Sequence, residues 1–168
     1  MFGTGKNPRR WLIYIQMPES LPNIHFFQNL DPAQTALLKP LFEQFNCPPD
    51  TTVFEQGESA SYLYYLIKGD VAIRYKPYDS PPITLTRLHA GDVFGWSAVI
   101  GSTHYTSSII SESQVEALRI RGGDLLALVR EHPETGTIIM DHLASVVSSR
   151  WKNARAQVQS LLNSDQTK

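Results

Sequence analysis

The segment GWSAVIGSTHYTSS, residues 95–108, contains the residue types of an anion-binding turn. Gly95 can adopt backbone conformations that other residues avoid, and a short helix starting near Ser97 would direct unpaired backbone N–H groups toward one point. The hydroxyls of Ser97, Thr106 and Ser107 would add further donors. Because the segment has no Lys, Arg, Asp or Glu, it has no charged partner of its own for an anion.

Two motifs begin like catalytic or nucleotide-binding signatures and do not complete them. GWSAV starts like the nucleophile elbow of serine hydrolases, but Val99 stands at the second glycine and no oxyanion-hole motif accompanies it. GTGK at residues 3–6 resembles the end of a P-loop, but no strand of a βα unit can precede residue 3. We therefore expect that the chain is not an enzyme.

The histidines do not indicate a metal site. None of them forms the His-x-His pair with a following glutamate that metal-binding barrels of the cupin type use. The five are His25, His89, His104, His132 and His142. A metal-dependent cupin-like enzyme is kept as a third hypothesis, which a metal analysis would test.

Length and charge limit the classes of partner. With 168 residues and 42% apolar content, the chain can bury one good core, so we expect one domain. A formal net charge of −1 and a pI near 6.5 provide no basic surface for a phosphate backbone. Only a few polar residues follow Leu162, which leaves no room for a helix-turn-helix, so we expect no direct nucleic acid binding.

The N-terminal stretch WLIYI, residues 11–15, follows basic residues but is too short for an export signal or a membrane span. Cys47 is the only cysteine, so the sequence has no disulfide framework and no thiolate cluster. These features predict a cytoplasmic protein without a membrane partner.

Short runs of β-branched and aromatic residues predict a mainly β fold with flanking helices. Residues 31–45 have helical spacing after an N-cap at Asp31, and six strand-length runs follow. The runs are TTVFE, YLYYLIK, VAIRYK, ITLTRL, YTSSIIS and VEALRI. No helix-length crossover separates them, which favours an antiparallel, jelly-roll-like barrel over a parallel sheet.

Glycine–acid pairs separate several of these runs. Gly57-Glu58, Gly69-Asp70 and Gly91-Asp92 predict tight hairpin turns, and residues 76–82 predict a longer exposed hairpin loop. After the last strand the helical period returns. Asp124 is a candidate cap for DLLALVREHP, and Pro133 would end that helix.

A longer C-terminal helix is predicted from about residue 137 to residue 162, with apolar residues near a 3.5 to 3.6 residue repeat. It would pack on the barrel or on a second subunit, so a homodimer through residues 138–162 is one predicted assembly. The resulting division is an N-terminal extension at 1–30, a β-roll at 31–137, and a C-terminal helix and tail at 138–168.

Three segments carry a family resemblance: FEQGESASYLYYLIKGDVAIRY at 54–75, LHAGDVFGWSAV at 88–99, and DLLALVREHP at 124–133. With the order of elements, they resemble the cyclic-nucleotide-binding domain of CRP/FNR regulators, cyclic-nucleotide-dependent kinases and gated channels over about residues 30 to 160. The resemblance implies an antiparallel β-roll with an N-terminal helix and a C-terminal helical pair. It also implies that a phosphate-binding cassette at about 95–107 holds a cyclic nucleotide.

The cassette departs from the family pattern at two places. The family has a glutamate after the cassette glycine, which accepts from the ribose 2′-hydroxyl, and an arginine about nine residues later, which pairs with the cyclic phosphate. An ungapped match puts Trp96 and Tyr105 at these positions. His104, Arg74 or Arg87 would have to supply the missing cation.

The sequence therefore predicts a stand-alone regulatory or sensor domain in which tight binding of cAMP or cGMP is in doubt. Trp96 and Tyr105 could stack on another, less charged small ligand, or fill the pocket as core aromatics. In the latter case the domain would be a ligand-free module for dimerisation or protein interaction, and its downstream protein partner is unknown. The candidate ligand-binding residues are Gly95, Trp96, Ser97, Ala98, His104, Tyr105, Thr106 and Ser107.

Overall fold

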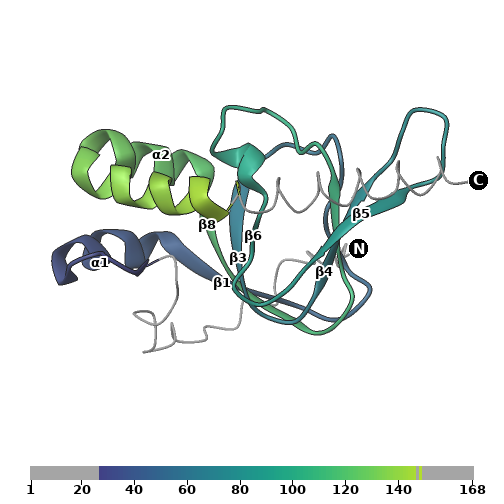
Figure 1. The fold of residues 1–168 in the computed structure, drawn as a ribbon, viewed down its shortest axis with the longest axis horizontal. Helices are drawn as coiled ribbons and strands as arrows, with labels where there is room; N and C mark the ends of the chain where they lie inside the picture. Colours follow the sequence, from purple (N-terminus) through teal and green to yellow (C-terminus); the bar gives the residue numbers. More distant parts are fainter. Residues whose placement is uncertain (1–26, 147, 149–168) are drawn as a thin grey trace, which may run out of the picture.

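The computed structural model describes residues 27–146 and 148, and they form a β-roll with helices at one end (Figure 1). Eight strands make two antiparallel four-stranded sheets. The first sheet has the order β1-β8-β3-β6, with β1 at Phe42–Cys47, β8 at Val115–Arg121, β3 at Tyr62–Lys68 and β6 at Val93–Phe94. The second has the order β2-β7-β4-β5, with β2 at Thr52–Phe54, β7 at Ser108–Ser111, β4 at Val71–Tyr75 and β5 at Ile83–Leu88. The predicted antiparallel β-roll with flanking helices is confirmed.

The predicted helix over residues 31–45 is too long. Helix α1 covers only Pro32–Leu38, a 3-10 turn (η3) follows at Lys39–Leu41, and β1 then begins at Phe42. The start was predicted correctly, because Asp31 caps α1 through the Gln34 backbone N–H, and the Gln34 side chain accepts from the Asp31 N–H. Pro40 explains the early end, since it has no N–H to donate within a helix and its ring clashes with the preceding turn.

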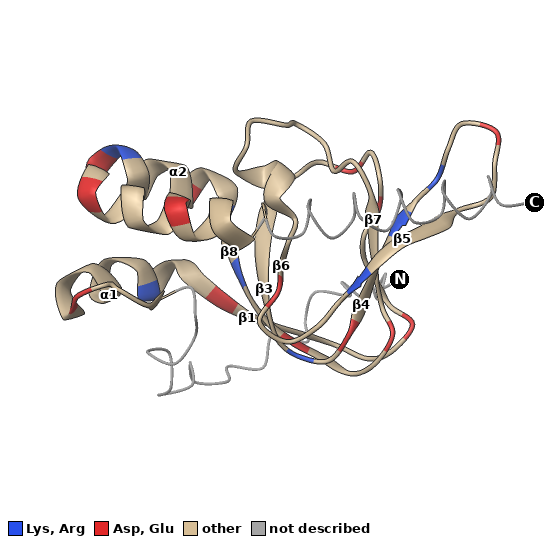
Figure 2. Cartoon of the chain, in the orientation of Figure 1, with Lys and Arg blue, Asp and Glu red and all other residues tan. Residues whose placement is uncertain are grey.

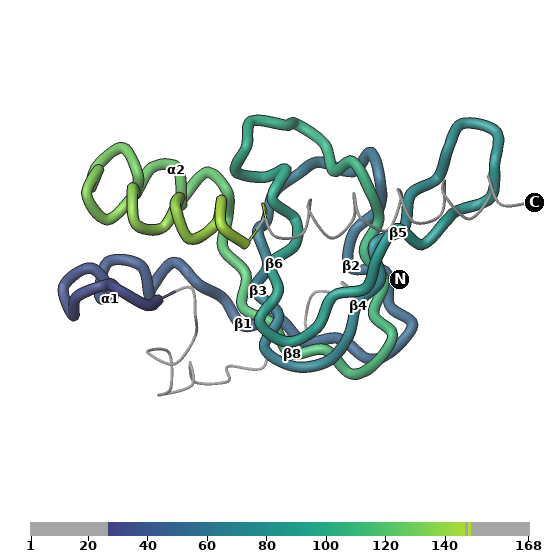
Figure 3. Tube along the Cα trace, viewed as in Figure 1, coloured from purple at the N-terminus to yellow at the C-terminus, as the bar shows by residue number. Residues whose placement is uncertain are grey.

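The three glycine–acid turns are not hairpins. Gly57-Glu58 lies between β2 and β3, Gly69-Asp70 between β3 and β4, and Gly91-Asp92 between β5 and β6, and each pair of strands belongs to different sheets. The glycines do take positive φ, as expected. The turns therefore carry the chain from one sheet to the other. The loop at residues 76–82 is a hairpin, joining the paired strands β4 and β5, and it projects from the body of the roll (Figure 3).

Two helical segments follow β8. Helix α2 covers Gly122–Glu131, and its N-cap is Arg121, which makes no side-chain capping bond, so the predicted cap at Asp124 is wrong. Asp124 instead lies in the first turn, where a carboxylate interacts favourably with the helix dipole. The next helix begins at Pro133, earlier than predicted, because proline fits a first helical turn. The predicted span from residue 149 onward lies outside the described residues.

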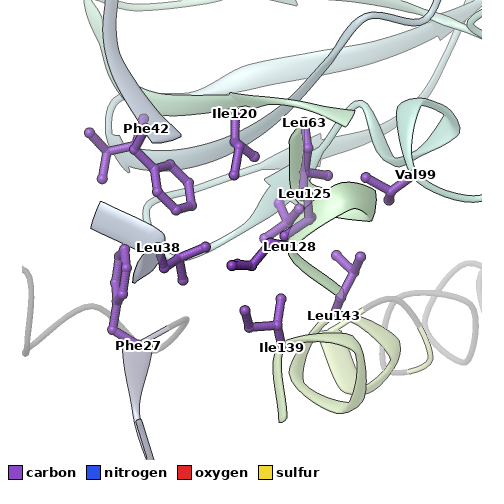
Figure 4. Packing of buried hydrophobic residues seen from close by; sticks show 12 residues of the cluster. Phe27, Leu38, Phe42, Leu63, Val99, Ile120, Leu125, Leu128, Ile139 and Leu143 are labelled. Carbon is purple, nitrogen blue, oxygen red and sulfur yellow. The ribbon is translucent and has the colours of Figure 1, made fainter. Parts of the chain in front are cut away.

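The buried residues form two clusters. One lies between the two sheets. The other joins the first sheet to the helices, and Figure 4 shows its side chains converging from α1, α2, the helix after Pro133 and the strands. Leu38, Leu125 and Ile139 in this second cluster are fully buried. No helix within residues 27–146 is long and apolar enough to cross a membrane.

Candidate ligand cassette

The cassette connects β6 to β7 and begins at Gly95, which has a φ of 79°. A Cβ atom at this position would lie 2.6 Å from the Tyr62 carbonyl oxygen, so a side chain would fit neither the backbone conformation nor the space. The glycine thus allows the cassette to lie directly against β3. This backbone approach is the reason for a glycine at the start of the turn.

The helical part of the cassette is shorter than the sequence suggests. It is a 3-10 turn (η4) of three residues, Trp96–Ala98. The backbone N–H groups of Ala98, Val99 and Ile100 donate to Gly95 and Trp96 carbonyls within the turn, at 3.0–3.2 Å. These three groups are therefore not available to an anion. The expected set of unpaired N–H donors is reduced accordingly.

Tyr105, which the ungapped match places at the position of the family arginine, is a buried aromatic that is only 5% exposed. Its ring stacks on Phe54 with centroids 3.6 Å apart and planes at 13°. Its hydroxyl donates to the Tyr62 carbonyl oxygen at 2.8 Å and accepts from the Tyr62 N–H at 2.9 Å. Burial raises the pKa of this hydroxyl, so it stays neutral at physiological pH. The side chain is fixed by protein groups on its face and at its tip.

The backbone around Tyr105 is also paired. The Tyr105 N–H donates to the Glu58 carbonyl at 2.9 Å, and the Gly57 N–H donates to the Tyr105 carbonyl at 2.8 Å. The turn after β2 therefore holds this part of the cassette on both sides. Phe54 and Tyr62 were not among the predicted site residues, because their contacts with Tyr105 span 51 and 43 residues of sequence and leave no local pattern.

The remaining predicted residues are spread over different surroundings. Ser97 is buried, whereas Trp96 is half-buried and packs against the cluster shared with the helices. His104 and Thr106 are exposed, and His104 Nδ1 lies 2.7 Å from the Thr103 hydroxyl. Ala98 and Ser107 are half-buried. The eight predicted ligand-binding residues are close in sequence but do not all lie in one environment.

The strand arginines do not face the cassette. In the second sheet, Ile73 lies opposite Ile109, and both pack toward the cluster between the sheets. The next pair, Arg74 and Ser108, therefore lies on the other face of that sheet. Arg87 is also on that outer face, where its Nε lies 2.9 Å from a Glu112 carboxylate oxygen. Neither arginine occupies the position of the missing phosphate partner.

The cassette contacts the helices that follow the roll. Val99 belongs to the same buried cluster as Ile139 and Leu143, while Ile100 is 66% exposed. Gly122, the first residue of α2, lies so close to the cassette that an added Cβ would be 2.1 Å from the Ala98 carbonyl oxygen. Packing thus connects the turn to α2 and to the helix after Pro133.

Figure 2 shows the turn after β6 without Lys, Arg, Asp or Glu, while basic residues lie on β4 and β5. Within residues 27–146, no group of three or more His, Cys, Asp or Glu side chains could hold a metal ion. The chemistry available at the cassette is that of hydroxyls, aromatic rings, backbone groups and the exposed imidazole of His104.

Comparison with known proteins decides the family. The cyclic nucleotide-binding domain family matches residues 44–132, which is more than half of the chain. The chain belongs to the cyclic nucleotide-binding domain family. Among solved structures, a cyclic nucleotide-binding protein from Geobacter metallireducens is similar at 26% identity with a TM-score of 0.71, covering 82% of this chain and 99% of that one.

Two of the curated relatives are transcriptional regulators. The cAMP-activated global transcriptional regulator CRP of Pasteurella multocida is 33% identical over 71% of this chain and 56% of its own length. A CRP-like cAMP-activated global transcriptional regulator of Mycobacterium tuberculosis is 27% identical over 89% of this chain and 65% of its own length. The matched part thus spans less than two thirds of either relative.

Proposed function

We propose that the chain is a regulatory domain whose cassette does not bind cAMP or cGMP tightly. The observation that carries the proposal is the environment of Tyr105, the residue that the ungapped match puts at the position of the family arginine. Its ring is buried and stacked on Phe54, and its hydroxyl donates to the Tyr62 carbonyl and accepts from the Tyr62 N–H. Its raised pKa keeps the group neutral. Tyr105 therefore supplies no positive charge to a cyclic phosphate.

The absence of a charged partner should weaken the binding of a cyclic nucleotide strongly. Removing the charged partner of a buried anion typically costs about 2–5 kcal/mol, which corresponds to a loss of roughly 30-fold to several thousand-fold in affinity. Trp96 adds to this loss, because an indole nitrogen is a donor only and cannot accept a hydrogen bond from a ribose hydroxyl. A micromolar site would become a millimolar one.

The regulatory role rests on the packing between cassette and helices. Val99, Ile139 and Leu143 share one buried cluster, and Gly122 holds α2 against Ala98. A change in the cassette would shift these helices, and a protein bound to the helices would in turn stabilise one cassette conformation. The relatives named above are regulators rather than catalysts, which agrees with this role. The homodimer predicted through residues 138–162 and the downstream partner stay predictions.

Isothermal titration with cAMP and with cGMP tests the proposal. The natural chain is compared with a Trp96→Glu, Tyr105→Arg double variant, which restores the family pair. The matched control is Trp96→Glu with Tyr78→Arg, which makes the same change in composition but places the arginine on an exposed residue of the hairpin. Thermal melts of all three proteins establish that each one is folded.

We expect no heat of binding from the natural chain or the control at ligand concentrations up to about 1 mM, and binding by the double variant. Micromolar binding by the natural chain would refute the proposal, because it would mean that another cation holds the phosphate. This outcome depends only on the natural chain, so it is decisive even if the double variant does not fold.

A further inference from the structure

A groove of about 490 Å³ lies on the outer face of the second sheet, on the side opposite to the cassette. Its size is within the range of small-molecule sites. The segment after β2, the end of β4, the strand β7 and the β4–β5 hairpin form its walls. The described residues that line it are Glu55, Gln56, Arg74, Lys76, Pro77, Tyr78, Pro82, Ser108 and Ile110.

Arg74 is the unusual member of this lining. Its side chain is half-buried, and its Nε atom is buried without a hydrogen-bond partner among the described residues. A buried donor without a partner is unfavourable, and more so when the group is charged. Arg87, on the same outer face, instead forms an ion pair with Glu112. Arg74 thus has an unmet requirement for an acceptor at the wall of the groove.

The backbone around the groove is fixed by Gln56. Its side-chain oxygen accepts from the Lys76 N–H at 2.8 Å, and its side-chain nitrogen donates to the Lys76 carbonyl at 3.2 Å. The Gln56 N–H donates to the Ser108 hydroxyl at 2.8 Å, which leaves the hydroxyl proton of Ser108 for another acceptor. These bonds join the segment after β2 to the residue that follows β4 and to the first residue of β7.

The charges of the lining indicate what it would bind. Arg74 and Lys76 are cationic, and Glu55 forms no ion pair with either of them in the described part of the chain. A guanidinium, an ammonium and a hydroxyl supply donors to several oxygens, as the three acceptor oxygens of a phosphate require. A carboxylate ligand would leave part of this set unused.

We propose that this groove binds a small organic phosphate that also carries hydroxyl or amino groups. Arg74, Lys76 and Ser108 donate to the phosphate, and Glu55 accepts from a hydroxyl or amino group of the same ligand. The fully exposed ring of Tyr78 offers a face on which a planar group of the ligand stacks. The site is separate from the cassette, so it stands whether or not the proposed function holds.

Adenosine 5′-monophosphate is the probe, because it has a phosphate, ribose hydroxyls, an amino group and a planar ring. Its binding is measured by isothermal titration to the natural chain, to Arg74→Gln and to Arg87→Gln. The two variants remove one positive charge from the same face of the same sheet, but Arg87 does not line the groove. Benzoate, a planar carboxylate, is titrated in parallel.

We expect binding of adenosine monophosphate to the natural chain, a loss of about tenfold or more in Arg74→Gln, and a change of less than about twofold in Arg87→Gln. Benzoate should bind at least about tenfold more weakly than the phosphate. Absence of binding to the natural chain up to about 10 mM, equal effects of the two variants, or equal binding of benzoate would each overturn the proposal. The Trp96→Glu, Tyr105→Arg double variant should bind adenosine monophosphate as the natural chain does, because its substitutions lie in the cassette and not in the groove.

Discussion

Removing the hydroxyl of Tyr105 tests whether this side chain stabilises the core. The variant Tyr105→Phe keeps the ring that stacks on Phe54 and deletes only the oxygen. That oxygen makes two hydrogen bonds with one residue, because it donates to the Tyr62 carbonyl at 2.8 Å and accepts from the Tyr62 N–H at 2.9 Å. The substitution therefore leaves two backbone groups without their partner.

The expected cost follows from these two groups. Tyr105 is 5% exposed, so water reaches the vacated position poorly. Each backbone group left without its bond costs about 1–3 kcal/mol, so a destabilisation of about 2–6 kcal/mol is expected for the pair. This is a large part of the stability of a domain of this size, which is typically about 5–15 kcal/mol.

Urea unfolding measures the effect as a lower midpoint with an unchanged slope. Tyr78→Phe is the matched control, because Tyr78 is fully exposed on the hairpin and its hydroxyl should contribute less than about 0.5 kcal/mol. If Tyr105→Phe is no more destabilised than this control, the hydroxyl does not hold β3 to the cassette. The argument that Tyr105 has become a structural residue would then fail.

Two further predictions concern stability. Burial raises the pKa of Tyr64 above its unfolded value of about 10, so its contribution to stability is complete below that pH and is lost as pH rises further. Above that pH, the free energy of unfolding in urea should therefore fall with pH less steeply in Tyr64→Phe than in the natural chain, by about 1.4 kcal/mol per pH unit. Equal slopes for the two proteins would contradict this prediction. Gly122→Ala should destabilise the protein by about 2 kcal/mol or more, because the new Cβ would lie 2.1 Å from the Ala98 carbonyl oxygen. The control Gly123→Ala should be neutral or slightly stabilising, because no atom lies within 4 Å of its new Cβ. Similar melting temperatures for the two variants would refute the close packing of α2 on the cassette.

Local sequence patterns predicted the positions of most strands but not which strands pair with each other. The runs at 62–68 and 83–88 match β3 and β5 because β-branched and aromatic residues mark a strand wherever it pairs. Strand β1 was mistaken for the end of a helix, since Phe42 and Phe45 continue the spacing of the leucines before Pro40. The glycine–acid turns were located correctly, but a turn does not reveal which sheet the next strand joins.

The same distinction applies to the site. The start of the cassette follows from Gly95, whose positive φ is a local requirement. The role of Tyr105 depends on Tyr62 and Phe54, which are distant in sequence, so it could be stated only as one of several alternatives. The face on which Arg74 lies depends on the pairing of β4 with β7, in which Arg74 lies opposite Ser108. A side-chain pattern alone does not determine that register.

The contacts of Tyr62 also explain why the cassette would not return to the family pattern by one substitution. Its carbonyl lies against Gly95 and accepts the hydroxyl proton of Tyr105, and its N–H donates to the same hydroxyl. An arginine at position 105 has donors but no acceptor, so the Tyr62 N–H would lose its partner, and Phe54 would lose the ring on which it stacks. Recovery of phosphate binding must therefore overcome a loss of core stability, which is why the titration of the double variant has to be read together with its melting temperature.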